Sequence, residues 1–304
     1  FQITQEYLGQ GTHLVYEAPL FKEVLQADTY KNGKGSTVSS NMSGIAGVAN
    51  IGNERNWTNH PFAQANWYAF GRLAWDPALS SEQIADEWIR QTFSNNDQVV
   101  TTAKKMMIAS REAVVNYMTP LGLAHMFLTG HHYGPGPWIS NTGRADWNPV
   151  YYHRADSIGI GFDRTASGSN ALKQYAPEIR NQFASTNTIP EKYLLWFHRL
   201  PWNFRMRSGK TLWNELCFKY QLGVDTTRWM RYQWVSLEDY IDEERYRQVK
   251  MFLDIQVHDA IWWKNACLLY FQTFSKMQIP VGVEKPNQTL EYYQNLKFPF
   301  APGN

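Results

Sequence analysis

The feature that most constrains the fold is a long helical repeat of mainly apolar residues that begins near Asp242. Its members recur every three or four residues and so share one side of a helix: Tyr246, Val249, Leu253, Gln256, Ala260, Trp263, Cys267, Tyr270 and Phe274. At ~1.5 Å per residue this helix would be on the order of 50 Å long, more than one small domain covers. Trp262, Ala266 and Leu269 form a second apolar face. We therefore expect the helix to be the central element of a bundle or to contribute to a subunit interface.

Helix signals dominate from residue 79 onward. Ser80 predicts a helix start, because Gln83 three residues later completes a capping box and Leu79 can pack against Ile84. A second helix is predicted over residues 97–118 and is bounded by Pro120.

Two further helices are expected before the long one. Ser208 predicts the cap of a helix that reaches Gly223, and a separate helix is predicted over residues 225–235.

The first 78 residues show a different pattern, in which strands and helices alternate. An apolar and polar alternation predicts a strand that ends at Glu6, and a buried parallel strand is predicted over residues 44–51. Helices are expected from Pro19 and from Pro61. This order favours β/α units, which need neighbouring strands that two units cannot supply.

Between the helices, residues 130–170 are dense in Gly, Pro, Trp, Tyr, His and Arg and show no period. Loops of this length inside a compact protein are usually functional or disordered, and the aromatic content argues against disorder. We expect a lid in which Trp138 or Trp147 faces a sugar ring and Arg144 or Arg154 meets an anion. The alternative is a structural loop that holds the helices together.

Glu6 is the candidate catalytic residue, because barrel enzymes place catalytic groups at the carboxyl ends of strands. A solvated surface glutamate is the alternative. Asn50, Asn53 and residues 55–57 follow the second predicted strand, and their amides suit hydroxyl recognition, although Asn is also common in turns.

Composition excludes several classes of function. Charged residues make up 18% of the chain and the formal net charge is +2, with no long run of like charges, so nucleic acid and membrane surfaces are not expected partners. Cys217 and Cys267 lie in apolar helical contexts and are expected in the core. The adjacent His131 and His132 are a weak metal signal. No phosphate loop, dinucleotide fingerprint or nucleophile elbow is present, so no metal or cofactor is predicted.

Several long motifs closely resemble the glycoside hydrolase family 67 α-glucuronidases, and the resemblance runs essentially from end to end. The matching segments are residues 3–7 (ITQEY), 44–52 (GIAGVANIG), 56–58 (NWT), 63–75 (AQANWYAFGRLAW) and 130–138 (GHHYGPGPW).

The resemblance implies an α/β then all-α fold: residues 1–78 are the last β/α units of a (β/α)8 TIM barrel, and residues 79–304 are a large α-helical C-terminal domain. It implies an enzyme that removes glucuronic or 4-O-methylglucuronic acid, α-1,2-linked, from the terminal xylose of xylooligosaccharides, with inversion. Glu6 matches one of two carboxylates that activate water, and Trp147 matches the tryptophan that the helical region sends into the uronic acid site. The helical region is expected to form a homodimer.

In this scheme the general acid and the second base candidate lie on earlier strands, outside this chain. We therefore expect the isolated chain to be inactive. The alternative from another class is a non-catalytic carbohydrate-binding or dimerisation fragment.

Overall fold

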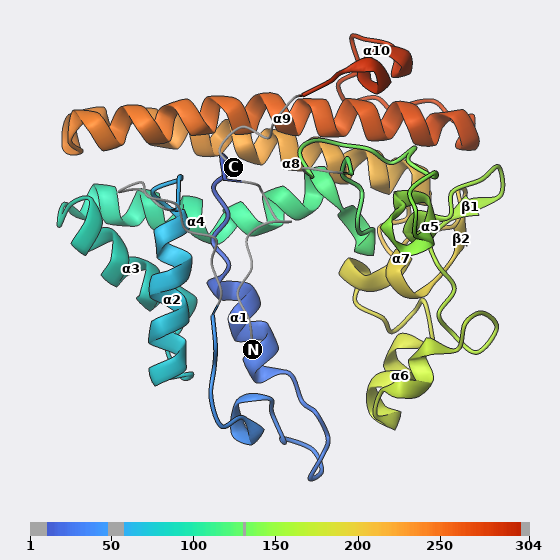
Figure 1. Ribbon diagram of the computed structural model, residues 1–304, viewed down its shortest axis with the longest axis horizontal. Helices are drawn as coiled ribbons and strands as arrows, with labels where there is room; N and C mark the ends of the chain where they lie inside the picture. Colours follow the sequence, from blue (N-terminus) through green and yellow to red (C-terminus); the bar gives the residue numbers. More distant parts are fainter. Residues whose placement is uncertain (1–10, 48–57, 130–131, 299–304) are drawn as a thin grey trace. The chain divides into compact units, whose positions relative to one another are not determined.

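The computed structural model describes residues 11–47, 58–129 and 132–298, and most of them are helical (Figure 1). The chain forms two compact units. Of the described residues, unit 1 contains 11–47, 58–114 and 226–258, and unit 2 contains 115–129, 132–225 and 259–298. The division between domains predicted at residue 78 stays a prediction.

Unit 1 is built from helices. They are α1 (Ala18–Gln26), η1 (Ser39–Asn41), α2 (Ala63–Trp75), α3 (Ser81–Thr92), most of α4 (Asp97–Met118), the end of α8 (Leu212–Val235), η6 (Glu238–Tyr240) and the first half of α9 (Glu243–Ser275). Helices α2 and α3 pack side by side (Figure 1). The rings of Phe62, Trp88, Phe93 and Trp234 contact one another in the core, with centroids 5.3–5.6 Å apart.

The segment before α1 is held in the core of unit 1 by side chains. Gln256, fully buried on α9, accepts from the Leu14 N–H at 3.0 Å and donates to the Leu14 carbonyl at 3.2 Å. Asn66 of α2 donates to the Val15 carbonyl and accepts from the Glu17 N–H, both at 2.8 Å. The backbone groups of this segment are not bonded within a helix or a strand. The buried side-chain amides of Gln256 and Asn66 provide their hydrogen bonds instead.

Unit 2 combines short elements with parts of long helices. They are η2 (Pro120–Gly122), η3 (Ala145–Trp147), α5 (Pro149–His153), β1 (Gly159–Ile160), η4 (Ala171–Gln174), α6 (Pro177–Phe183), η5 (Glu191–Tyr193), α7 (Leu194–Phe197), β2 (Leu200–Pro201), the first part of α8, the second half of α9 and α10 (Leu290–Asn295). Strands β1 and β2 are antiparallel, with Gly159 opposite Pro201. A core cluster joins Tyr133, Trp262, Ala266 and Tyr293.

The helix starts predicted at Ser80 and near Asp242, and the helix predicted over residues 97–118, are confirmed. Ser80 caps α3, its hydroxyl accepts from the Gln83 N–H, and the Gln83 side chain accepts from the Ser80 N–H. Helix α4 spans the predicted range, and α9 begins one residue after Asp242, whose carboxylate accepts from the Arg245 N–H at 3.0 Å.

The split predicted at Gly223 is wrong. Helix α8 runs unbroken from residue 212 to 235, and the Ser208 hydroxyl donates to the Glu215 carboxylate at 2.6 Å instead of capping a helix. Val224, Thr227 and Met230 are fully buried, so their packing outweighs the ~1 kcal/mol that a mid-helix glycine costs.

The β/α expectation is met only in its helices. Helix α1 carries Pro19 in its first turn and α2 follows Pro61. The strand that ends at Glu6 lies outside the described residues. Of the strand predicted over 44–51, only residues 44–47 are described. They are largely exposed and pair with no strand among the described residues. A buried parallel strand needs flanking strands, and the described part of the chain supplies none here.

Residues 130–170 are mainly irregular as predicted, but they also contain η3, α5 and β1.

Among the described residues, no helix is both long and apolar enough to cross a bilayer.

Candidate functional site

Glu6, Asn50, Asn53 and residues 55–57 lie outside the residues that the structure describes. Their predicted roles at the mouth of a barrel stay predictions. The site is therefore built from the loop of unit 2 that carries Arg144 and Trp147.

Arg144 and Trp147 are brought together. The Arg144 guanidinium lies 5.2 Å from the centroid of the Trp147 ring. It also forms a forked ion pair with Asp146, with Nε–Oδ1 at 3.0 Å and Nη2–Oδ2 at 2.6 Å, which holds the pKa of that carboxyl below its usual range. Trp147 is 52% exposed. A ring this accessible beside a cation can stack on the flat face of a sugar.

Asn148 fixes the shape of this loop. Its side chain is buried, accepts from the Thr142 N–H at 2.9 Å and donates to the Arg144 carbonyl at 3.1 Å. The chain then enters α5 at Pro149, whose missing N–H costs nothing in the first turn. Trp147 is thus presented by a loop closed on itself.

Two aromatic side chains bond to the backbone of this loop. The Tyr152 hydroxyl donates to the Asp146 carbonyl at 2.9 Å, and His125 Nε2 lies 3.3 Å from the Trp147 carbonyl oxygen. Burial lowers the pKa of His125, which favours the neutral ring, and the tautomer protonated on Nε2 donates to that carbonyl. The rings of His125 and Tyr152 contact each other at 4.9 Å.

Sequence reasoning missed this support. Tyr152 stacks on Trp196 with centroids 6.0 Å apart, and the Arg164 guanidinium lies 3.8 Å from the Trp196 ring centroid. Tyr152 lies on α5 and Trp196 on α7, and only the tertiary structure brings these two short helices together. The density of aromatic and basic residues in 130–170 was a signal for Tyr152 and Arg164, but it does not reach Trp196.

Trp138 lies elsewhere in unit 2. Its half-buried ring meets Tyr270 of α9 edge to face at 6.3 Å and packs against the cluster that contains Tyr133 and Trp262. These contacts show a ring set in the core, and its role in substrate binding stays a prediction.

The two cysteines are core residues. Cys217 and Cys267 are free and fully buried, as predicted for core residues, and burial raises the pKa of Cys267 to about 12. In the described part of the chain, no three His, Cys, Asp or Glu side chains are grouped so that they could hold a metal ion.

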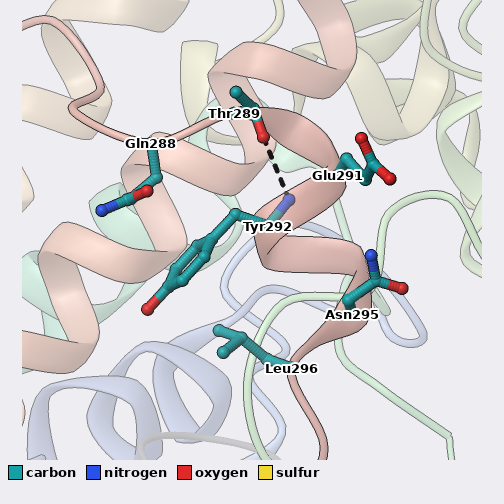
Figure 2. Close-up of a pocket in the computed structure, with 6 residues that line it drawn as sticks. All are labelled: Gln288, Thr289, Glu291, Tyr292, Asn295 and Leu296. Atoms are coloured by element: carbon teal, nitrogen blue, oxygen red, sulfur yellow. Dashed lines mark hydrogen bonds between the residues drawn. The ribbon is translucent and has the colours of Figure 1, made fainter.

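A hollow of about 520 Å³ lies beside α10 (Figure 2). Its lining residues are Gln288, Thr289, Glu291, Tyr292, Asn295 and Leu296. The Thr289 hydroxyl accepts from the Tyr292 N–H at 3.2 Å, which caps the short helix. The lining holds a carboxylate and no basic side chain, so it does not suit an acidic ligand.

Comparison with known proteins decides the family. Residues 58–284 match the Glycosyl hydrolase family 67 C-terminus, and residues 1–57 match the Glycosyl hydrolase family 67 middle domain. The chain belongs to glycoside hydrolase family 67.

Similar proteins carry the corresponding name. Alpha-glucuronidase A of Emericella nidulans is 38% identical over 292 residues, which cover 92% of this chain and 34% of that protein. Alpha-glucuronidase A of Aspergillus tubingensis is 38% identical over 96% of this chain and 37% of its own length, and Alpha-glucuronidase of Hypocrea jecorina is 35% identical over 91% and 33%. The family 67 chain thus spans about a third of the length of the curated relatives it matches.

Proposed function

We propose that this chain is the C-terminal part of an α-glucuronidase that hydrolyses the α-1,2 bond between glucuronic or 4-O-methylglucuronic acid and the terminal xylose of xylooligosaccharides. The observation that carries the proposal is the match of residues 1–284 to two consecutive parts of family 67. The names of the relatives support an α-glucuronidase, and the bond and substrate come from the family resemblance.

The proposed reaction is a single displacement with inversion. In such a reaction a general acid protonates the leaving oxygen while a carboxylate activates water on the opposite face of the ring, with the two groups ~6.5–9.5 Å apart. Glu6 supplies one water-activating carboxylate. A second carboxylate and the general acid come from residues outside this chain, and the two base carboxylates titrate as a coupled pair.

Trp147 supplies a stacking surface for the uronic acid ring in this proposal. The loop closed by Asn148, together with the contacts of Tyr152 and His125, holds the ring in place before substrate arrives, which reduces the ordering cost of binding. Arg144 donates to Asp146 through Nε and Nη2. Its Nη1 makes no hydrogen bond with the described residues, so Nη1 can donate to the sugar.

The test is hydrolysis of an aldouronic acid by the complete protein that contains this chain. Trp147→Ala should raise KM on the order of tenfold with a smaller effect on kcat, because a stacking contact present before and during the reaction is removed. Trp75→Ala is the matched control, since Trp75 is 87% exposed in unit 1 and should not affect KM. An unchanged KM in Trp147→Ala would refute the assignment of this ring.

The proposed homodimer forms through unit 1. Trp229 and Tyr232, three residues apart on α8, are 36% and 71% exposed, and Met251 on α9 is 51% exposed. Trp262 and Ala266, on the second apolar face of α9, pack inside unit 2. The exposed rings of α8 are therefore the better candidates for a subunit contact.

A non-catalytic carbohydrate-binding unit is the second candidate. The observation that favours it is that the Trp147 loop is held entirely by residues of unit 2 and needs no catalytic carboxylate. The isolated chain should then bind aldouronic acid without hydrolysing it. Hydrolysis by the isolated chain would contradict the placement of the general acid outside it.

A further inference from the structure

Four flat side chains of unit 2 form a continuous series of face contacts that ends at the Trp147 loop. The guanidinium carbon of Arg164 lies 4.0 Å from the centroid of the Phe162 ring and 3.8 Å from that of the Trp196 ring. The Trp196 ring lies nearly parallel to the Tyr152 ring, with their centroids 6.0 Å apart and their planes at 18°. We call Phe162, Arg164, Trp196 and Tyr152 the Arg164 stack.

Arg164 is held in this stack by aromatic faces and a carbonyl. Its side chain is buried, and its Nη1 donates to the Trp196 carbonyl. Phe162 also contacts the Arg154 guanidinium, whose carbon lies 3.3 Å from the ring centroid, so this ring is itself fixed by a further contact. Because a guanidinium is flat, it can cover two ring faces at once, which the ammonium group of a lysine cannot do.

Tyr152 connects the stack to the Trp147 loop. Its hydroxyl donates to the Asp146 carbonyl at 2.9 Å, one residue before Trp147. The hydroxyl oxygen lies in the plane of the phenol ring, so the position of the ring decides where this hydrogen bond can form. A change in the packing of Trp196 against this ring therefore displaces the hydroxyl, and with it the backbone that carries Trp147.

The backbone of Arg164 makes contacts that are independent of its side chain. Its N–H donates to the Phe197 carbonyl at 2.9 Å, and its carbonyl accepts from the Leu172 N–H at 3.1 Å. A substitution at this position keeps both hydrogen bonds. The contacts of the guanidinium with Phe162 and Trp196 can therefore be altered separately from the course of the chain.

We propose that Arg164 is a positioning residue for substrate binding, which acts through Trp196 and Tyr152 on the ring of Trp147. The inference rests on the proposed function, in which Trp147 stacks on the uronic acid ring. A stacking ring that is already in place when the sugar arrives binds it more tightly, because no free energy is spent on ordering the ring. Since Arg164 acts on binding and not on the bond that reacts, it affects KM and leaves kcat nearly unchanged.

Hydrolysis of an aldouronic acid by the complete protein that contains this chain tests the inference. Arg164→Lys keeps the charge but loses the planar group, so KM should rise by about threefold or more with kcat near that of the parent. In a protein that already carries Trp147→Ala, Arg164→Lys should have no further effect on KM, because it acts only through that ring. A merely structural loss would instead lower kcat and be the same in both backgrounds.

The matched control is Arg205→Lys. Arg205 is an exposed arginine of unit 2 that donates to the Gly209 carbonyl at 2.9 Å and lies outside the Arg164 stack. Its replacement should leave KM and kcat at the values of the parent protein.

A second variant decides the matter if Arg164→Lys does not fold. Tyr152→Phe keeps the stacked ring and removes only the hydroxyl that reaches the Asp146 carbonyl, so it should raise KM in the parent but not in Trp147→Ala. An unchanged KM in the variant that folds, or a rise in KM that is equally large in the Trp147→Ala background, would overturn the inference. An unchanged KM in Trp147→Ala alone would refute the proposed stacking itself, so the two failures are distinguishable.

Discussion

The position of Trp147 depends on polar groups that bond to the backbone of its own loop. Asn148 bonds the backbone on both sides of the turn, while Tyr152 and His125 reach the carbonyls of residues 146 and 147. Only Trp147 and Arg144 could be selected from sequence, since their residue types suit sugar binding. The supporting residues have ordinary types, and their role depends on tertiary contacts that the sequence does not reveal.

At the same scale, Glu17 makes the stability of unit 1 depend on pH. It is 3% exposed, and burial raises its pKa from 4.5 to about 8, despite the opposing effect of Arg111. Between pH 4.5 and 8 the folded protein keeps a proton on Glu17 that the unfolded chain has lost. The stability that goes with this buried, neutral side chain is therefore fully present below pH 4.5 and is lost as the pH rises toward 8.

Chemical denaturation across pH checks this prediction. The free energy of unfolding of the parent chain relative to Glu17→Gln should fall by up to about 1.4 kcal/mol per pH unit between pH 4.5 and 8. Glu178→Gln, at an exposed position, is the control and should run parallel to the parent. A constant difference between parent and Glu17→Gln would show that Glu17 is ionised in the folded protein throughout this range.

At the scale of elements, the sequence predicted helices where local chemistry decides them. Helix α3 begins at its capping box and α4 ends before Pro120, because these signals act over a few residues. Helix α8 was divided wrongly at Gly223, because its continuity depends on core packing around Val224 and Met230. Irregular segments such as 130–170 give no period from which their contacts could be inferred.

Gly134 lies where this irregular segment packs against Trp262 of α9. Its φ is +84°, and a Cβ added there would lie 2.0 Å from the Trp262 ring. Gly134→Ala should therefore destabilise unit 2 by on the order of 3 kcal/mol through backbone strain and overpacking.

Urea unfolding measures this cost. Gly143→Ala is the control, because a Cβ there meets no atom within 4 Å and no left-handed backbone is required. A loss in Gly134→Ala no larger than in the control would mean that the loop does not pack on Trp262 as described.

At the scale of the whole molecule, the proposed subunit contact can be tested by mass. The chain has a mass of 35.3 kDa, and light scattering should give twice that value. Tyr232→Asp should shift the mass to that of one chain by placing a charge in an apolar contact. Val281→Asp is the control, since Val281 is 98% exposed in unit 2, and it should leave the dimer intact. A parent chain that is monomeric at all concentrations would argue against the dimer.

In the proposed function, this family 67 chain contributes a catalytic carboxylate, Glu6, to an α-glucuronidase. The most direct measurement is the turnover of an aldouronic acid by the complete protein with and without Glu6→Gln. The side chain keeps its size but can no longer accept a proton from water, so kcat should fall by orders of magnitude while KM changes little. Near-normal kcat in Glu6→Gln would contradict the account.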